Sequence, residues 1–176
     1  MACNSATLSG LTLDCETSKG GIKTVWVAKY SEAIATAVAA VAETADTIAM
    51  SAITAADSAA TWYKYEFKRN TGSMTSTLNV DEANGTNYVS TDVVLQFSRM
   101  EAKKRAEMKA LTLSETHVIV LDCNNKAWFL GANEAVTASA GTGQTGTAKT
   151  DGNYYQLTLQ ANDDSYPIEV SGTLPA

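Results

Sequence analysis

The sequence predicts a mainly β protein, a β-sandwich or barrel with one short α-helix packed on it. Several short segments alternate apolar and polar side chains, which is the pattern of strands with one buried face. Turn-forming pairs such as Asn84-Gly85 and Asn124-Asn125 separate these segments. Large apolar residues are scarce beside the many alanines, so we expect the thin core of a sandwich.

The first third of the chain predicts one clear strand and one ambiguous region. In residues 31–45, Ser31 is a candidate helix cap, but the abundance of Ala and Thr weakens the amphipathic signal and leaves the assignment open. We expect one β-rich domain over residues 22–176. The expected order before the central block is an N-terminal arm (1–21), a strand (22–29), the ambiguous region, a returning strand (47–54) and a loop (55–60).

The central block predicts a strand, a projecting hairpin, a second strand and a helix. Residues 62–69 alternate, with Tyr63, Tyr65 and Phe67 on one face. A polar hairpin near residues 70–89 follows, and its alternating second arm continues to Phe97. Ser98-Arg-Met-Glu101 has the spacing of a capping box, so we expect a helix from there through Ala110.

The last third predicts a hairpin and two closing strands. Asn124-Asn125 lies between two apolar runs, which indicates a tight β-hairpin. A Gly/Thr/Ala-rich stretch follows, and we expect a short strand near Thr147 within it. The expected segments are a strand (116–122), its return (126–130), the Gly/Thr/Ala-rich stretch (135–152), an alternating strand (154–160) and a final strand (168–170).

Composition excludes several classes of function. The 176-residue chain has a formal net charge of −6, which argues against a nucleic-acid-binding face. The most apolar stretch, residues 34–60, contains three carboxylates and lacks the Leu, Ile and Phe content of a membrane span. The N-terminus lacks the features of a signal peptide. The three cysteines, Cys3, Cys15 and Cys123, have no close pair, so we expect free thiols in a reducing cytoplasm, with a Cys3–Cys15 disulfide as the alternative.

No motif in the sequence predicts catalysis, a cofactor or a metal. Residues 141–146 spell G-x-G-x-x-G, but they lack the preceding buried strand and following helix of a dinucleotide site, so we expect a flexible surface loop. His117 is the only histidine and is expected to be structural. The carboxylate pairs Asp81-Glu82 and Asp163-Asp164 are expected in turns. We therefore expect a protein that is not an enzyme.

Two surfaces are candidates for contacts between subunits. The first is the polar hairpin, which is long enough to project from the domain and has little apolar anchoring. The second is the basic face of the expected helix. The simpler interpretation is a solvated surface, and the more specific one is a set of salt bridges to the acidic side of another copy of the chain. The candidate interface residues are Thr71, Met74, Leu78, Val80, Asn84 and Gly85 on the hairpin, and Lys103, Lys104, Arg105 and Lys109 on the helix.

Several runs resemble a family of structural proteins from tailed phages of gut bacteria. The longest is Lys64 to Val89, KYEFKRNTGSMTSTLNVDEANGTNYV. The others are Arg99-Met-Glu-x-x-Lys-Arg, Trp128-Phe-Leu-Gly, Thr145-Gly-Thr-Ala-Lys-Thr-Asp-Gly-Asn-Tyr and the N-terminal Lys19-Gly-Gly-Ile-Lys. Within tailed phages, the order of elements is similar to that of tail-tube proteins. The alanine-rich residues 34–60 depart from the compact subunit that this resemblance implies.

The resemblance implies a virion protein assembled in the host bacterial cytoplasm. The first role that it implies is that of the tail-tube subunit, which joins copies of itself into stacked, hexameric rings around a conduit for DNA. Such a subunit contacts other virion proteins and lets DNA pass without specific binding. The alternatives are a head-decoration, neck or ring protein, or a ligand-binding β-sandwich. In the last, Trp26, Trp62 and Trp128 would supply stacking surfaces, but their positions among apolar strand residues favour a core role.

Overall fold

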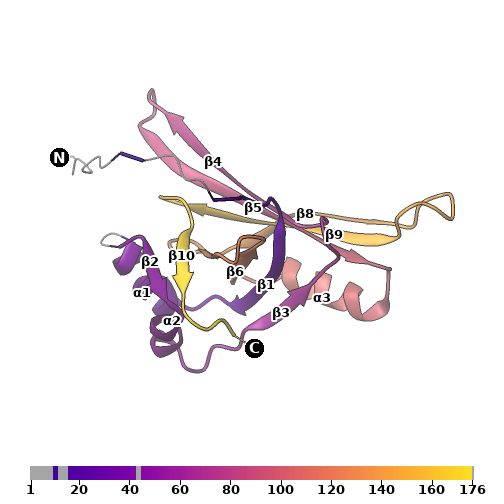
Figure 1. Cartoon of the computed structure of the whole chain (residues 1–176), viewed down its shortest axis with the longest axis horizontal. Helices are drawn as coiled ribbons and strands as arrows, with labels where there is room; N and C mark the ends of the chain where they lie inside the picture. The colour runs from indigo at the N-terminus through magenta and orange to yellow at the C-terminus, as the bar shows by residue number, and fades with distance from the viewer. Residues whose placement is uncertain (1–9, 12–15, 43–44, 176) are drawn as a thin grey trace.

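The computed structural model describes residues 10–11, 16–42 and 45–175, which form two β-sheets and three helices (Figure 1). Most of the expected arm (1–21) therefore lies outside the described residues. The elements are β1 (Ile22–Lys29), α1 (Glu32–Ala42), β2 (Thr47–Ala49), α2 (Met50–Ala56), β3 (Tyr63–Glu66), β4 (Ser73–Asp81), β5 (Thr86–Ser98), α3 (Ala102–Thr112), β6 (Thr116–Asp122), β7 (Ala127–Leu130), β8 (Thr137–Gln144), β9 (Tyr154–Asp163) and β10 (Ile168–Ser171).

The two sheets pack as a sandwich, which confirms the mainly β fold. One sheet has six strands in the order β2-β10-β7-β6-β1-β3, and the other has four in the order β4-β5-β9-β8. Every second side chain of β5 and β9 faces the six-stranded sheet. The register pairs Val93 with Leu159 and Leu95 with Leu157, so these four side chains lie together on that face. These four side chains are at most 1% exposed and form the centre of the first core.

A second core lies on the other face of the six-stranded sheet, under α1 and α2 (Figure 1). The middle sheet is thus covered on both faces, and the buried run of β6 shows the continuous apolar pattern of such a strand. Val118 and Val120 belong to the first core, whereas Ile119 belongs to the second. The molecule consists of three layers: the four-stranded sheet, the six-stranded sheet and the pair of helices.

The structure corrects the expected single helix, because three helices are present in the described residues. The open region 31–45 contains α1, which buries Ile34, Ala35 and Val38. The expected strand 47–54 is wrong after Ala49, where α2 begins. Met50 and Ile53 are three residues apart and both buried, so helical spacing places them together in the second core.

The expected capping box is also wrong. Ser98 is the last residue of β5, and α3 begins only at Ala102, with Glu101 as an N-cap that makes no side-chain capping bond. Between them, Arg99 has a φ of 67°, a left-handed conformation that ends the strand. The Lys104 ammonium then donates hydrogen bonds to the backbone oxygens of Ser98 and Arg99.

The Gly/Thr/Ala-rich stretch forms a strand earlier than expected. β8 ends at Gln144 and includes the first four residues of the G-x-G-x-x-G run, so only Thr145 and Gly146 lie in the surface loop. Gly143 pairs with Tyr155, and a Cβ at Gly143 would lie 2.9 Å from the Tyr155 ring. The absence of a side chain therefore permits this close packing.

Asp163 does not lie in a turn but ends β9, and it is only 9% exposed. Its carboxylate accepts hydrogen bonds from the backbone N–H of Gly131 at 3.2 Å and of Asn133 at 2.9 Å. The expected turn at Asp163 is wrong because β9, with its alternation of buried and exposed side chains, continues three residues past Gln160. Asp163 thereby holds the loop after β7 against the end of β9.

Candidate assembly interface

The β4–β5 hairpin projects well beyond the sandwich (Figure 1). Its base covers the first core, where Met74 packs beside the buried residues of the two sheets. Farther out, Leu78 and Val80 lie on the same face as Met74 but are 47% and 58% exposed. The six-stranded sheet no longer covers this part of the hairpin, so its apolar side chains face solvent in a single copy.

The tip of the hairpin is held by one carboxylate. Asp81 accepts hydrogen bonds from the backbone N–H of Ala83 at 2.9 Å and of Asn84 at 3.2 Å, and from the Asn84 amide at 2.6 Å. These bonds, that of the Asn84 side chain foremost, lower the pKa of Asp81. Gly85 completes the turn with a φ of 68°. Asn84 and Gly85 therefore shape the tip.

The candidate hairpin residues thus have different roles. Met74 belongs to the subunit's own core, and the Thr71 hydroxyl donates a hydrogen bond to the backbone oxygen of Lys68 at 2.6 Å. Leu78 and Val80 are the two that present apolar surface to solvent. An exposed apolar pair on a projecting arm is available for contact with another protein surface.

Both edges of the four-stranded sheet are unpaired in the described residues. β4 pairs only with β5, and β8 pairs only with β9. Neither strand contains Lys or Pro, residues that commonly prevent pairing at sheet edges, although β8 has a bulge between Ala138 and Ala140. The two edges can therefore accept further strands through their main-chain groups.

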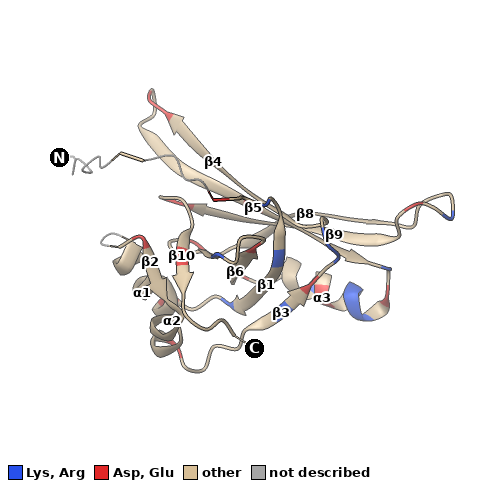
Figure 2. Cartoon of the chain, viewed as in Figure 1, with Lys and Arg blue, Asp and Glu red and all other residues tan. Residues whose placement is uncertain are grey.

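The outer face of this sheet is polar and almost uncharged. Within the paired strands it carries one charged side chain, Asp92, apart from Asp81 at the tip. Gln160 donates hydrogen bonds to Asp92 at 3.0 Å and to Ser90 at 3.2 Å. Figure 2 shows few coloured segments along β4, β5, β8 and β9. The polar residues facing outward include Thr75, Thr77, Gln96, Thr142, Gln156, Thr158 and Asn162.

Helix α3 divides its basic residues between internal and exposed roles. Lys104 binds the end of β5, as described above, and also lies 3.7 Å from the Glu101 carboxylate. The Tyr65 hydroxyl donates to Glu107 at 3.0 Å, and burial together with this carboxylate raises the pKa of Tyr65. Three basic residues of the helix are exposed and make no ion pair with any described residue: Lys103, Arg105 and Lys109.

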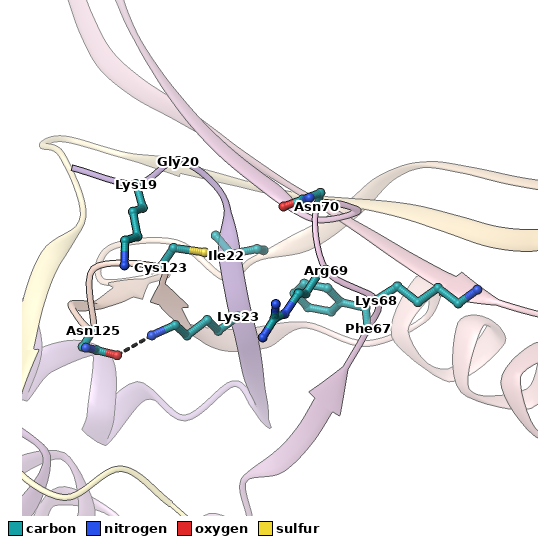
Figure 3. Close-up of a pocket in the computed structure, with 10 residues that line it drawn as sticks. All are labelled: Lys19, Gly20, Ile22, Lys23, Phe67, Lys68, Arg69, Asn70, Cys123 and Asn125. Carbon is teal, nitrogen blue, oxygen red and sulfur yellow. Dashed lines mark hydrogen bonds between the residues drawn. The ribbon is translucent and has the colours of Figure 1, made fainter. Parts of the chain in front are cut away.

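A basic pocket of about 630 Å³ lies at the base of the hairpin (Figure 3). Among the residues that the structure describes, its lining includes Lys19, Lys23, Lys68 and Arg69 and no carboxylate. The sequence contains both pairs of cations, but they are 45 residues apart, and only the antiparallel pairing of β1 with β3 brings them together. This pocket was not among the sequence predictions.

His117 is buried and has hydrogen-bonding partners at both ring nitrogens. The described residues contain no group of three or more His, Cys, Asp and Glu side chains placed to hold a metal ion. None of the helices in the described part of the chain has the length and apolar character needed to cross a membrane.

Comparisons with models of known protein families, with curated proteins and with solved structures each found no match to this chain. The fold and its surfaces are therefore the basis for inferring function.

Proposed function

We propose that this chain is a virion structural protein that acts by self-assembly, in the first instance as the tail-tube subunit of a tailed phage. The observation that carries the proposal is the four-stranded sheet, whose two long edges are unpaired among the described residues. Joining β4 of one copy to β8 of the next would continue the sheet around a closed ring, which removes both edges at once. Copies of one chain can do this without any other component.

The outer face of the sheet suits the lining of a conduit for DNA. A duplex carries a dense row of phosphates, and basic side chains would hold it through counterion release. The Ser, Thr, Asn and Gln side chains on this face, with Asp92 as the charged group, offer little such attraction. A continuous sheet with this face inward would let DNA pass without retaining it.

The exposed part of the hairpin supplies a second contact. Leu78 and Val80 remain uncovered by their own subunit, and a neighbouring copy that covers them would gain the free energy of apolar burial. Two of the three tryptophans, Trp26 and Trp62, offer no comparable surface for a ligand. Trp26 is 4% exposed, and Trp62 is half-buried against the second core.

Negative-stain imaging and sedimentation of the purified protein at high micromolar concentration test the proposal. Tubes or stacked rings with a central channel are expected, whereas a closed cap or a single ring would assign the chain to another position in the virion. A monomer at every salt concentration and pH would overturn self-assembly.

A paired substitution tests the role of the hairpin. Leu78→Asp with Val80→Asp should leave the monomer folded, because both side chains are exposed, and should abolish assembly by placing carboxylates in an apolar contact. Leu113→Asp is the control, since Leu113 is an apolar side chain 78% exposed directly after α3, outside the β4–β5 hairpin. If the double variant forms normal tubes, Leu78 and Val80 do not contribute to the interface.

A further inference from the structure

The basic pocket is built where three segments meet. The segment before β1 is held to the β6–β7 turn, because the Lys19 N–H donates to the Asn124 side chain at 2.8 Å and the Asn124 amide donates back to the Lys19 oxygen at 3.1 Å. The register of β1 with β3, in which Thr24 pairs with Glu66, brings the loop after β3 alongside. Lys19, Lys23 and Arg69 therefore share one wall of the domain.

These cations have no anionic partner in the described residues. Lys23 donates to the neutral amide oxygen of Asn125, and none of the pocket's basic residues forms an ion pair. In Figure 3, Lys19 and Lys23 extend toward the turn that carries Asn125, Arg69 lies across β1 from them, and Lys68 points away. Like charges that line one pocket repel one another, so an anion in the pocket would relieve the repulsion.

The same chain carries a matching anion. Residues 73–98, which form the whole hairpin, contain no Lys or Arg, and their carboxylates include Asp81 and Glu82 at the tip. Leu78 and Val80 lie next to this tip, and the pocket includes the apolar side chains of Ile22 and Phe67. Tip and pocket are thus complementary in charge and both contain apolar surface.

The two surfaces lie at opposite ends of β4. The loop that carries Arg69 precedes the strand, and the tip follows it after nine residues, at about 3.3 Å each, so that roughly 30 Å separates them. A tip cannot reach the pocket of its own subunit. A contact between them joins unlike surfaces of two copies, and such a contact repeats into a ring or a filament.

We propose that the acidic hairpin tip of one copy docks in the basic pocket of the next. This inference rests on the proposed self-assembly and names the two surfaces that specify it. Glu82 and the Asp81 carboxylate meet Lys19, Lys23 and Arg69, while Leu78 or Val80 contacts the Phe67 side of the pocket. Because the contact is electrostatic, added salt weakens assembly.

Charge exchange tests the pairing. Lys23→Glu with Arg69→Glu reverses the pocket, and Glu82→Lys with Ala83→Lys reverses the tip while leaving Asp81 to hold its turn. Each pair should weaken assembly about tenfold or more by like-charge repulsion. Combining all four substitutions in one chain should restore assembly to within about threefold, because the complementary signs return. Lys29→Glu with Lys149→Glu, at exposed positions elsewhere, is the control of equal charge.

The outcomes separate this inference from the proposed function. If the wild-type protein assembles and the reversed pocket assembles equally well, the docking contact is wrong and self-assembly stands. If the wild-type protein stays monomeric, both are wrong. Loss of binding to a single-stranded oligonucleotide in the pocket variant, with assembly unchanged, would assign the pocket to phosphate instead. Should the reversed pocket fail to fold, Lys23→Gln with Arg69→Gln must abolish the salt dependence of assembly, and unchanged salt dependence would overturn the contact.

Discussion

The Nε2 atom of His117 lies 3.0 Å from both the backbone nitrogen and the backbone oxygen of Ser31. The Nδ1 atom lies 3.0 Å from the Gly131 oxygen, which can only accept, so Nδ1 carries the ring proton. The imidazole thereby joins the start of α1 to the end of β7. The expectation of a structural histidine agrees with this geometry.

Stability should fall as the pH drops through the range in which an unfolded histidine titrates. Burial lowers the pKa of His117 from its ordinary value of 6.5. Below pH 6.5 the histidine of the unfolded chain binds a proton that the folded protein does not bind. The free energy of unfolding therefore decreases as the pH falls. Urea titrations at pH 7.5 and 5 should show the loss. Asp57, Asp81 and Asp151 have pKa values lowered from 3.8 and titrate in a more acidic range.

The variant His117→Asn provides the control for this pH dependence. It should be less stable than the wild type at pH 7.5, and its free energy of unfolding should change less between the two pH values. An equal pH dependence in both proteins would mean that another group is responsible.

Gly72→Ala should destabilise the domain by about 1–3 kcal/mol, the usual range for overpacking a core. A Cβ at Gly72 would lie 2.6 Å from the Phe67 ring and 2.8 Å from the Ile22 side chain. Thermal and urea unfolding measure the effect. Gly20→Ala is the matched control, because no atom lies within 4 Å of its added Cβ, and its effect should be within about 0.5 kcal/mol.

Asp163→Ala should lower the free energy of unfolding by about 2–3 kcal/mol, because the backbone N–H groups of Gly131 and Asn133 lose their charged acceptor. Chemical denaturation measures the change. The adjacent Asp164→Ala removes an exposed carboxylate and should have the smaller effect. Similar losses in the two variants would contradict the structural role of Asp163.

Lys104→Met should destabilise the protein by about 1 kcal/mol, since the backbone oxygens of Ser98 and Arg99 lose a charged donor. Lys103→Met, one residue away and exposed, should change stability by less than about 0.5 kcal/mol. Equal stability of the two variants would mean that Lys104 contributes no more to stability than an exposed residue of α3. For an assembly test of α3, Arg105 and Lys109 are therefore better targets than Lys104.

The outer part of the hairpin should exchange its amide hydrogens faster than its base in an isolated subunit. Within the described part of the chain, no second layer lies beneath residues 80–87, whereas Val89 and Val93 are buried. Hydrogen exchange measured by mass spectrometry on monomer and assembly should show protection of the tip only after assembly. Strong protection in both states would make the tip part of the subunit's own stable fold.

Local sequence patterns determined the elements whose signals are contained within a few residues. The β6–β7 hairpin follows from two apolar runs around Asn124-Asn125, and Asn125 has the left-handed φ of 64° that this turn requires. Strand β5 follows from its alternation, and its buried side chains are the predicted ones from Val89 to Leu95. Such patterns can be recognised in the sequence alone, because side-chain periodicity and turn preference depend on the local backbone and on neighbouring residues.

Tertiary structure decided what depends on a distant partner. Thr47–Ala49 becomes a strand only beside β10, while the following residues turn into α2 because Met50 and Ile53 bury against the second core. The glycines of β8 form a strand because β9 lies alongside. The basic pocket exists because β1 and β3 pair across the chain, and no local pattern records a pairing between residues so far apart in sequence.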